Sequence, residues 1–470
     1  MSLTGVFIVL NKSIKRVKVP IYNLSECSKN FEEVELGLSE ELALSEADRC
    51  LNCKNPLCIK GCPIEVNIPA FISEIKQHNY ESAYKIIYKN NVLPGTCARV
   101  CEQESQCEKF CVRGKKGDSV AIGALQRFVT DIHTSIYKNK QKNSELSDNY
   151  KVAIVGSGPA GLGCAGELLR NNFKVVMYES KILAGGVLTY GIPEFRLPKK
   201  IVNEEIDQLI DDGLEVKSNC KVMDKITIED LIKQENYDAV FIGTGAYMSK
   251  KLNINGENLK NVYTARDFLG EVNSNIINNL KQHTMYKKNV AVIGGGNVAV
   301  DSARTAKRLG ANVFIVYRRS KDEMPASKKQ IDFAKQEGVK FYNLLNPVEI
   351  KKDNEGNAVS MHCQKMKLGD IDSSGRRSSV AIEGQYRSFD VDYIISAIGA
   401  KPEALIKSST NGLRTDSNGR IIIDESTGQT SIPNVFAGGD VVTGPATVVL
   451  ALSSGKRAAR SICEYLKKNN

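Results

Sequence analysis

Cysteines carry the densest chemistry in this sequence. Thirteen are present, and nine of them lie between Cys27 and Cys111. The run CLNCKNPLCIKGCP brings four thiols together between Cys50 and Cys62, and a second run of four begins at Cys97. Thiolates packed this densely can converge on a small inorganic centre. Because no secretory signal is evident, we expect a metal centre in a reducing compartment rather than a disulfide framework.

The spacing in the first run separates two kinds of centre. Zinc sites prefer two CxxC pairs with a longer span between them. Iron–sulfur proteins use denser runs that end in Cys-Pro, as here, and two-cluster ferredoxins send the fourth cysteine to the other cluster. A helical stretch at 68–88 separates the two runs, so we favour two [4Fe–4S] clusters over zinc. The isolated cysteines, which we expect to be small buried hydrophobic side chains, are Cys27, Cys164, Cys220, Cys363 and Cys463.

Two glycine-rich motifs point to a second kind of chemistry, the binding of dinucleotides. The first, Gly156-x-Gly158-x-x-Gly161, follows an apolar strand and opens an apolar helical pattern. Its first glycine permits a tight turn, the second lets the backbone approach a pyrophosphate, and the third lets helix pack against strand. The next strand ends in Glu179, which is placed to accept hydrogen bonds from a ribose diol.

The second motif, Gly294-x-Gly296-x-x-Ala299, has the same surroundings, but its following strand ends in Arg318 and Arg319. An acid at this position suits a free 2′-hydroxyl, whereas a guanidinium binds a 2′-phosphate through two parallel hydrogen bonds. We therefore expect FAD at the first motif and NADPH at the second. The alternative, that the two arginines are a solvated strand end, is the weaker interpretation.

Three further segments are expected to complete the flavin site. They are a loop rich in glycine and proline (AGGVLTYGIPEFRLPK), the end of an exit strand (DAVFIGTG) and a returning strand (NVFAGGD). The helix after the returning strand can direct its N-terminus at the flavin ring. The candidate cofactor contacts in these segments are Gly186, Arg196, Gly245, Gly439 and Asp440.

The elements around these motifs predict an α/β protein of three parts. Residues 1–149 are interpreted as an α-helical iron–sulfur domain that ends in a polar linker at 138–149. Two Rossmann-like dinucleotide-binding domains follow. The FAD domain is discontinuous, over 150–245 and 396–470, and the NADPH domain is inserted into it at 246–395.

Composition excludes several classes of protein. No apolar run approaches the ~20 residues that span a bilayer, so we expect no membrane association. No nucleic-acid motif or interleaved basic and aromatic patch is present. The formal net charge of +10 favours anionic partners, either NADPH or an acidic electron carrier, although the basic residues are spread along the chain. We expect a cytoplasmic protein.

Together these segments resemble the family of the small (beta) chain of NADPH-dependent glutamate synthase. That family is related to the large subunit of NADH-dependent ferredoxin–NADP reductase and the N-terminal part of dihydropyrimidine dehydrogenase. The resemblance covers nearly the whole chain, through the motifs NFEEVELG, CLNCKNPLCIKGCP, GVLTYGIPEFRLPK, GGGNVAVD, YRRS with EMPA, and AGGDVVTGPATVVLA. It implies a helical bundle with two [4Fe–4S] clusters, followed by an FAD domain with an inserted NADPH domain.

The resemblance also implies that the two cysteine runs interleave rather than hold one cluster each. One cluster would take the first three cysteines of the first run and the last of the second, Cys50, Cys53, Cys58 and Cys111. The other would take Cys62, Cys101, Cys107 and a side-chain oxygen that matches Gln126 in GALQRF. Cys97 is then left without a cluster. Many relatives have Cys-Pro where this chain has Cys101–Glu102, which we expect to alter the local turn and the potential of the second cluster.

These observations predict hydride transfer from NADPH to flavin, followed by one-electron steps through the clusters. Hydride transfer needs no protein acid or base, so no catalytic residue is assigned. The resemblance implies an electron-input subunit of glutamate synthase, which supports glutamate formation from glutamine and 2-oxoglutarate with a large partner chain. The alternative is the NADPH-side subunit of a ferredoxin–NADP oxidoreductase with a ferredoxin-type partner. A cluster-bearing regulatory protein ranks last, because it would leave the flavin loops without purpose. We expect an oligomer or hetero-oligomer.

Overall fold

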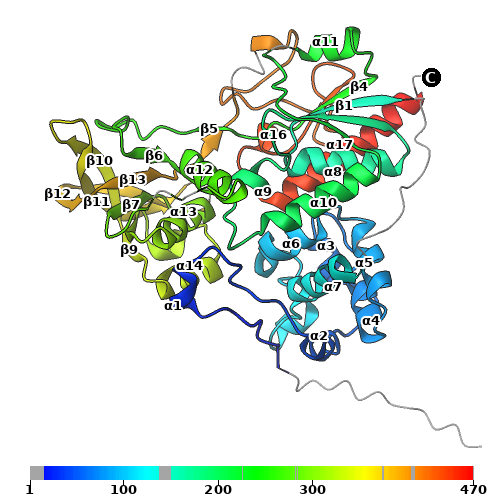
Figure 1. The fold of residues 1–470 in the computed structure, drawn as a ribbon, viewed down its shortest axis with the longest axis horizontal. Helices are drawn as coiled ribbons and strands as arrows, with labels where there is room; N and C mark the ends of the chain where they lie inside the picture. Colours follow the sequence, from blue (N-terminus) through cyan, green and yellow to red (C-terminus); the bar gives the residue numbers. More distant parts are fainter. Residues whose placement is uncertain are drawn as a thin grey trace, which may run out of the picture.

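The computed structural model describes residues 15–136, 150–224, 226–280, 282, 284–372, 375–403 and 408–468. The expected linker at 138–149 lies outside the described residues. Figure 1 shows three bodies: a helical domain at the lower right, a first Rossmann-like domain above it, and a second Rossmann-like domain to the left. In the described part of the chain, no helix is long and apolar enough to cross a membrane.

The helical domain is a bundle of short helices whose starts are set by local caps. Ser39 accepts a hydrogen bond from the Leu42 N–H, and Asn67 accepts one from the Ala70 N–H, so that each satisfies a free donor at a helix start. The elements are α2 (Glu40–Ala47), α3 (Leu57–Lys60), α4 (Ile68–Lys76), α5 (Tyr80–Tyr88), α6 (Pro94–Val100), η1 (Gln103–Ser105), η2 (Val112–Lys115) and α7 (Ile122–Ile136). Before them, α1 (Leu24–Cys27) lies against the second Rossmann-like domain (Figure 1).

The first Rossmann-like domain contains a five-stranded sheet in the order β15-β4-β1-β2-β3, with every pair parallel. Its strands are β1 (Lys151–Val155), β2 (Lys174–Tyr178), β3 (Glu215–Lys217), β4 (Ala239–Ile242) and β15 (Val435–Ala437). Four of them, β1, β2, β4 and β15, are buried and mostly apolar, as a parallel sheet covered on both faces requires, whereas the short edge strand β3 is not buried. Its helices are α8 (Pro159–Arg170), α9 (Val187–Tyr190), α10 (Lys199–Asp211), α11 (Ile228–Lys233), α16 (Asp440–Thr443) and α17 (Val448–Lys468).

The second Rossmann-like domain repeats this plan with the strand order β6-β13-β7-β8-β9, again all parallel. Its strands are β6 (Val262–Thr264), β7 (Asn289–Ile293), β8 (Asn312–Tyr317), β9 (Lys340–Asn343) and β13 (Tyr393–Ser396). Its helices are α12 (Ala265–Ile277), α13 (Asn297–Arg308), η3 (Lys321–Glu323) and α14 (Lys328–Gln336). The chain enters and leaves this domain through an antiparallel pair, β5 (Met248–Ser249) and β14 (Ala400–Lys401).

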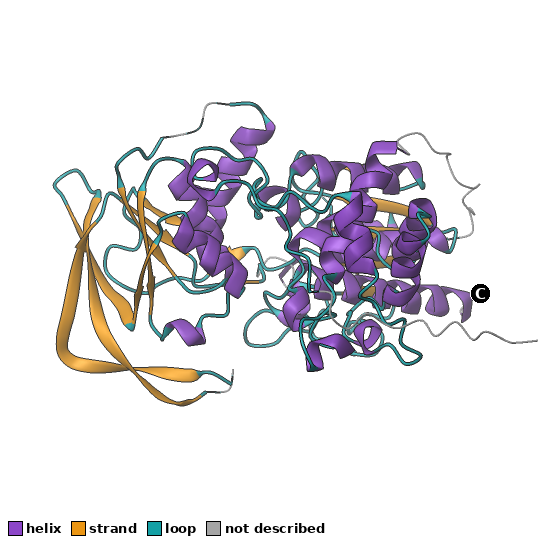
Figure 2. Cartoon of the chain, turned by 90° about the horizontal axis from the view of Figure 1, so that it is seen from below, coloured by secondary structure: helices purple, strands orange, loops and turns teal. Residues whose placement is uncertain are grey.

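A three-stranded antiparallel sheet extends from the second domain. It is formed by β10 (Leu345–Lys352), β11 (Ala358–Ile371) and β12 (Arg377–Asp390). Figure 2 shows the β11–β12 hairpin as a long ribbon that projects away from the helices. The sequence analysis assigned no role to this sheet, whose alternating polar residues carry no dinucleotide motif.

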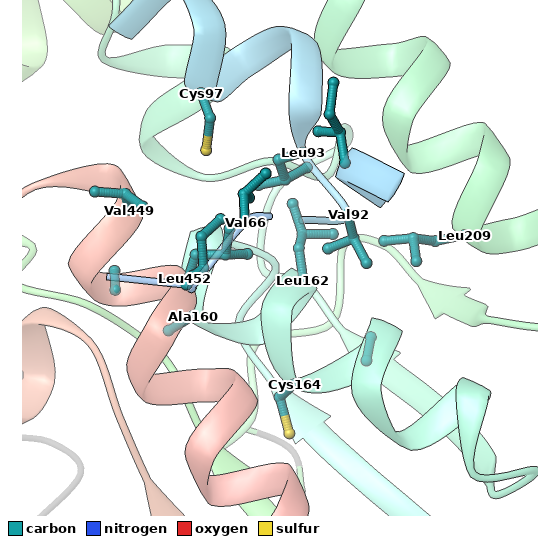
Figure 3. Packing of buried hydrophobic residues seen from close by; sticks show 14 of the residues in the cluster. Val66, Val92, Leu93, Cys97, Ala160, Leu162, Cys164, Leu209, Val449 and Leu452 are labelled. Atoms are coloured by element: carbon teal, nitrogen blue, oxygen red, sulfur yellow. The ribbon is translucent and has the colours of Figure 1, made fainter. Parts of the chain in front are cut away.

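One apolar core joins the helical domain to the first Rossmann-like domain. Val66, Val92 and Leu93 of the helical domain pack with Leu162 of α8 and Leu452 of α17 (Figure 3). Polar contacts fix the same surfaces: the Lys456 ammonium donates to the Asn90 carbonyl at 2.9 Å, and the Ser453 hydroxyl donates to the Pro63 carbonyl at 2.7 Å. The two domains therefore form a continuous body.

Glu205 of α10 lies buried in this interface and generates a prediction about pH. Its carboxylate accepts hydrogen bonds from the Gly95 N–H at 2.6 Å, the Thr96 N–H at 3.1 Å and the Thr96 hydroxyl at 2.5 Å. Burial nevertheless raises the pKa of Glu205 from 4.5 to about 7. The folded protein then binds this proton more tightly than the unfolded chain does, so stability falls as pH rises between these two values.

We predict that Glu205→Gln removes this contribution, which has a slope of up to about 1.4 kcal/mol per pH unit. Thermal unfolding under anaerobic conditions, between pH 5.5 and 7.5 and with the cofactors bound, measures this pH dependence of stability. Glu271→Gln, a change of an exposed carboxylate on α12, should leave the pH dependence as in the native chain. An unaltered slope in Glu205→Gln would show that Glu205 does not titrate in this range.

Candidate functional site

The first glycine loop, between β1 and α8, has no room for a side chain at Gly156 or Gly161. Gly156 has a φ of +100°, and a Cβ on Gly161 would lie 2.0 Å from the Gly156 carbonyl oxygen. At Gly158, which caps α8, a Cβ would meet no atom within 4 Å. The loop is therefore closed on its inner side and open at the helix N-terminus, where free N–H groups can receive a pyrophosphate.

Glu179 lies beside this loop, at the carboxyl end of β2. Its Oε2 accepts hydrogen bonds from the Ser157 N–H at 3.2 Å and from the Ser157 hydroxyl at 2.5 Å. Its Oε1 accepts one from the Lys181 N–H at 2.7 Å. The carboxylate is thus fixed next to the glycine loop, in the place where an acid can bind a ribose diol.

Two distant segments meet at the same helix end. A Cβ on Gly186 would lie 3.0 Å from the Gly158 Cα, and a Cβ on Gly439 would lie 2.8 Å from the Ala160 Cβ. Burial raises the pKa of Asp440, which follows Gly439, to about 6. Gly245, with a φ of +72°, follows β4 and faces open space. These glycines leave the start of α8 accessible from several sides.

Arg196 does not lie with this group, although the sequence predicted it as a flavin contact. Its Nη1 donates to Asp301 of α13 at 2.6 Å, which joins the glycine- and proline-rich loop to the second Rossmann-like domain. The sequence analysis missed Asp301. The sequence did contain a signal for it. Asp301 is the single charged residue in the segment NVAVDSA of α13, and a charge that is buried requires a partner.

The second glycine loop, between β7 and α13, matches the first. Gly294 has a φ of +141°, and its Cβ would lie 2.5 Å from the Ala397 carbonyl oxygen. At Gly296 a Cβ would meet no atom within 4 Å, so this loop is also open at the helix N-terminus. Ala299 is fully buried, and its methyl group fits against the turn without a clash.

The two arginines after β8 have different surroundings. Arg318 is exposed, whereas Arg319 is buried and its guanidinium forms an ion pair with Asp372, just beyond β11. The two arginines therefore differ in what they can offer a ligand, and their role as phosphate ligands stays a prediction. The local pattern could not reveal the difference, because Asp372 is 53 residues away in the chain.

The first thiol group gathers around one apolar cavity. Cys50, Cys53, Cys58 and Cys111 all line it, together with apolar side chains such as Phe110. Burial, with the neighbouring Cys50 and Cys111 thiols, raises the pKa of Cys58 to about 12. Thiols in such a place are poor anions on their own and become good ligands for iron, whose positive charge favours the thiolate.

The second thiol group contains Cys62, Cys101 and Cys107, next to the first. Burial raises the pKa of Cys62 and of Cys107. Cys97, which the sequence analysis left without a cluster, also lies here: a hydrogen bond with Cys97, and then burial, raise the pKa of Cys101 well above its usual range. Gln126 of α7 donates from Nε2 to the Pro94 carbonyl at 2.8 Å, at the start of the helix that carries Cys97.

The separation of the thiols bears on the kind of metal centre. All thirteen cysteines are free thiols. Among the residues that the structure describes, no group of three or more His, Cys, Asp or Glu side chains converges as a single ion requires. In a cubane each cysteine binds a different iron, so its four thiolates lie further apart than around one zinc ion. The first thiol group, with its four thiols around one apolar cavity, supplies the set of donors that such a cluster takes.

Several relatives can be aligned with this chain over most of its length. The chain is 34% identical to the small chain of NADPH glutamate synthase from Escherichia coli (strain K12), over 97% of this chain and 98% of that one. It is 37% identical to the beta subunit of the NADP(+)-dependent formate dehydrogenase from Moorella thermoacetica, over 87% of this chain and 60% of the relative.

Solved structures show a similar fold at lower identity. FprA from Mycobacterium tuberculosis, in complex with NADPH, has a TM-score of 0.57 and 21% identity, and the match covers 68% of this chain and 85% of FprA. Thioredoxin reductase from T. acidophilum has a TM-score of 0.52 and 20% identity, over 68% of this chain and 98% of that chain. These matches establish the fold alone.

Two family models match the chain, and together they cover most of it. The pyridine nucleotide-disulphide oxidoreductase model matches residues 150–455, which contain both glycine loops. The model for dihydropyrimidine dehydrogenase domain II, with a 4Fe-4S cluster, matches residues 27–137, which contain both thiol groups. The chain therefore belongs to the pyridine nucleotide-disulphide oxidoreductase family, among the members that carry an N-terminal 4Fe-4S domain and include the small chain of NADPH glutamate synthase.

Proposed function

We propose that this chain is the electron-input subunit of a glutamate synthase, which oxidises NADPH and delivers single electrons to a large partner chain. The observation that carries this proposal is the continuous core between the two thiol groups and the first glycine loop. Cys97, in contact with Cys101, belongs to the same apolar core as Val449 of α17 and Ala160 of α8 (Figure 3). A cluster at the second thiol group would thus be rigidly placed beside the FAD loop.

Each cofactor would be bound by its own group of residues. The first glycine loop, Glu179 and Asp440 would hold FAD, and the second glycine loop with Arg318 would hold NADPH. We propose one [4Fe–4S] cluster in each thiol group, and domain boundaries at 1–149, 150–245 with 396–470, and 246–395. The chain passes between the proposed FAD and NADPH domains twice. The antiparallel β5–β14 pair lies where it does so, which supports these boundaries. When bound, FAD exchanges two electrons with a nicotinamide and single electrons with clusters.

Surface residues near the first thiol group suit a partner protein. Phe110 is 46% exposed and Val112 is 36% exposed at the cavity that Cys53 and Cys111 line. Exposed lysines lie next to these residues in the chain, at Lys54 and Lys109. An apolar contact with a basic rim favours an acidic redox partner in a reducing, cytoplasmic setting.

A second candidate function is supply of electrons to another acceptor, as in a ferredoxin–NADP oxidoreductase. What favours it is the variety of relatives, since the beta subunit of the NADPH-Fe(3+) oxidoreductase from Geobacter sulfurreducens (strain DL-1 / KN400) is 32% identical over 87% of this chain. Both candidates use the same four sites and differ only in the partner.

The arginine after β8 gives a prediction about nucleotide choice. Arg318→Gln should raise the Kd for NADPH by tenfold or more and leave the Kd for NADH nearly unchanged, because a charge-assisted hydrogen bond to the 2′-phosphate contributes roughly 1.5–3 kcal/mol. Arg319→Gln should instead disturb the β11 end that Asp372 anchors. Equilibrium binding of both nucleotides to each variant measures this, and equal losses for NADPH and NADH in Arg318→Gln would contradict the assignment.

The fourth ligand of the second cluster is tested by two matched variants. The anaerobically purified protein should contain on the order of eight iron and eight acid-labile sulfide. Gln126→Ala should alter the EPR signal of one cluster and leave FAD bound, whereas Cys97→Ser should leave both signals unchanged. The reverse result would make Cys97 the ligand, and zinc in place of iron would refute both clusters.

The function itself is tested with and without a large chain. The isolated protein should oxidise NADPH with an artificial acceptor and form no glutamate from glutamine and 2-oxoglutarate, because the described domains contain no fold for glutamine hydrolysis. Adding a glutamate synthase large chain should give glutamate at the expense of NADPH. Glutamine-dependent turnover by this chain alone would overturn the proposal, and transfer to ferredoxin but not to the large chain would favour the second candidate.

A further inference from the structure

Glu102, the residue directly after Cys101, contacts the second glycine loop. Its Oε1 accepts a hydrogen bond from the Asn297 Nδ2 at 2.6 Å. Asn297 is the first residue of α13 and follows Gly296, the glycine that opens toward a pyrophosphate. One side chain therefore spans from the second thiol group to the nucleotide loop of another domain.

A second contact closes the bridge. The Asn297 Oδ1 accepts a hydrogen bond from the Ser327 N–H at 2.9 Å, and the Ser327 hydroxyl donates to the Glu104 Oε1 at 2.9 Å. Glu102 directly precedes the short helix η1 and Glu104 lies within it, so the ring runs from the start of η1 through Asn297 and Ser327 and back to η1. Both atoms of the Asn297 amide are occupied, which fixes its orientation.

The surroundings of this bridge are polar rather than packed. A cavity separates η1 and Cys101 from the second Rossmann-like domain, and its lining includes Glu102, Glu104, Arg304 and Ser327. Across this space, hydrogen bonds connect the two domains directly. The Glu102 bridge is then a direct mechanical link between the nucleotide loop and the chain segment that holds Cys101.

We propose that Glu102 is a positioning residue that couples nucleotide binding at the second glycine loop to the redox state of the cluster held by Cys101. This inference rests on the proposed function for the presence of both groups. The nucleotide brings a pyrophosphate to Gly296, and reduction adds one negative charge to the cluster. Because the bridge holds these like charges at a fixed separation, each disfavours the other.

Linkage gives the coupling a definite sign. Binding of the nucleotide makes the cluster harder to reduce, and reduction of the cluster weakens nucleotide binding by the same factor. In turnover, arrival of an electron at this cluster would promote release of the oxidised nucleotide. A side chain without an acceptor at position 102 could not accept the Asn297 hydrogen bond, so this coupling depends on Glu102.

The test uses the anaerobic holoenzyme and tetrahydro-NADP, a dinucleotide that cannot be reduced or oxidised by the flavin. In a potentiometric EPR titration, saturating tetrahydro-NADP should lower the midpoint potential of the cluster held by Cys101. The signal of this cluster is the one that Gln126→Ala, or alternatively Cys97→Ser, alters. The midpoint potential of the other cluster should not change. The Kd of tetrahydro-NADP should rise about fivefold or more between the oxidised and the dithionite-reduced protein. A tenfold change in Kd corresponds to 59 mV for a one-electron couple.

Three variants assign this effect to the bridge. Glu102→Ala should abolish the shift, whereas Glu102→Gln, which can still accept from Asn297, should retain it. Glu65→Gln is the matched control, since Glu65 is an exposed carboxylate three residues after Cys62 with no contact to the second Rossmann-like domain among the described residues. If Glu102→Ala fails to load its clusters, Asn297→Ala removes both the donor to Glu102 and the acceptor for the Ser327 N–H, and it should reduce the shift.

The outcomes separate this inference from the proposed function. A full shift in Glu102→Ala, or no shift in the native chain despite tight tetrahydro-NADP binding and intact cluster signals, would refute the coupling alone. A chain that binds no dinucleotide or shows no cluster signal would instead refute the proposed function on which the coupling rests.

Discussion

The close packing around α8 is the constraint on which the rest of the structure depends. Three of its glycines each allow one contact that a side chain would prevent: a Cβ on Gly161 would meet the glycine loop, one on Gly163 would lie 2.5 Å from the Leu452 carbonyl oxygen of α17, and one on Gly166 would lie 2.3 Å from Val92 of the helical domain. The helix that presents its N-terminus to a dinucleotide is thereby in contact with its own sheet, with the C-terminal helix and with the iron–sulfur domain at once. Interiors packed at this density transmit displacement rather than absorb it.

The second Rossmann-like domain is held by a different kind of contact. Several of its links to the other domains are charged or polar: Arg196 with Asp301, Asn297 with Glu102, and Lys329 with Glu35. A small apolar cluster, in which Phe333 packs with Val34 and Phe195, adds to them. A buried group reinforces the first of these polar links, because the guanidiniums of Arg304 and Arg308 pair with Glu337 and stack on Phe195 of the glycine- and proline-rich loop. Polar contacts of this kind define a position without an extensive apolar surface, so this domain can change its contacts at lower cost than the helical domain can.

These two modes of attachment suit the sequence of events in an electron-input subunit. Groups that exchange single electrons must keep a constant separation, which the continuous core between α6, α8 and α17 provides. The nicotinamide nucleotide must enter and leave in each cycle, and its domain is the one held by hydrogen bonds and ion pairs. Glu102 belongs to both systems, since its backbone follows Cys101 and its side chain reaches the second glycine loop.

Local patterns in the sequence were sufficient to predict the parts of this protein that depend on short-range geometry. The two glycine loops, their flanking strands and helices, and the acid or arginine at the following strand end could be identified because each lies within about one βαβ unit of chain. The dense cysteine runs indicated iron–sulfur chemistry for the same reason, since neighbouring thiols must share a small region of space.

Tertiary structure alone decided which of these residues act together. Arg196 and Asp301 are 105 residues apart, and Glu102 and Asn297 are 195 residues apart. No local pattern in the sequence therefore predicts either contact. Arg318 and Arg319 are neighbours in sequence, yet one is exposed and the other is paired with Asp372, because burial depends on what packs over the strand end. Sequence determined the chemistry that is available to this chain, and packing between distant segments determined where that chemistry is assembled.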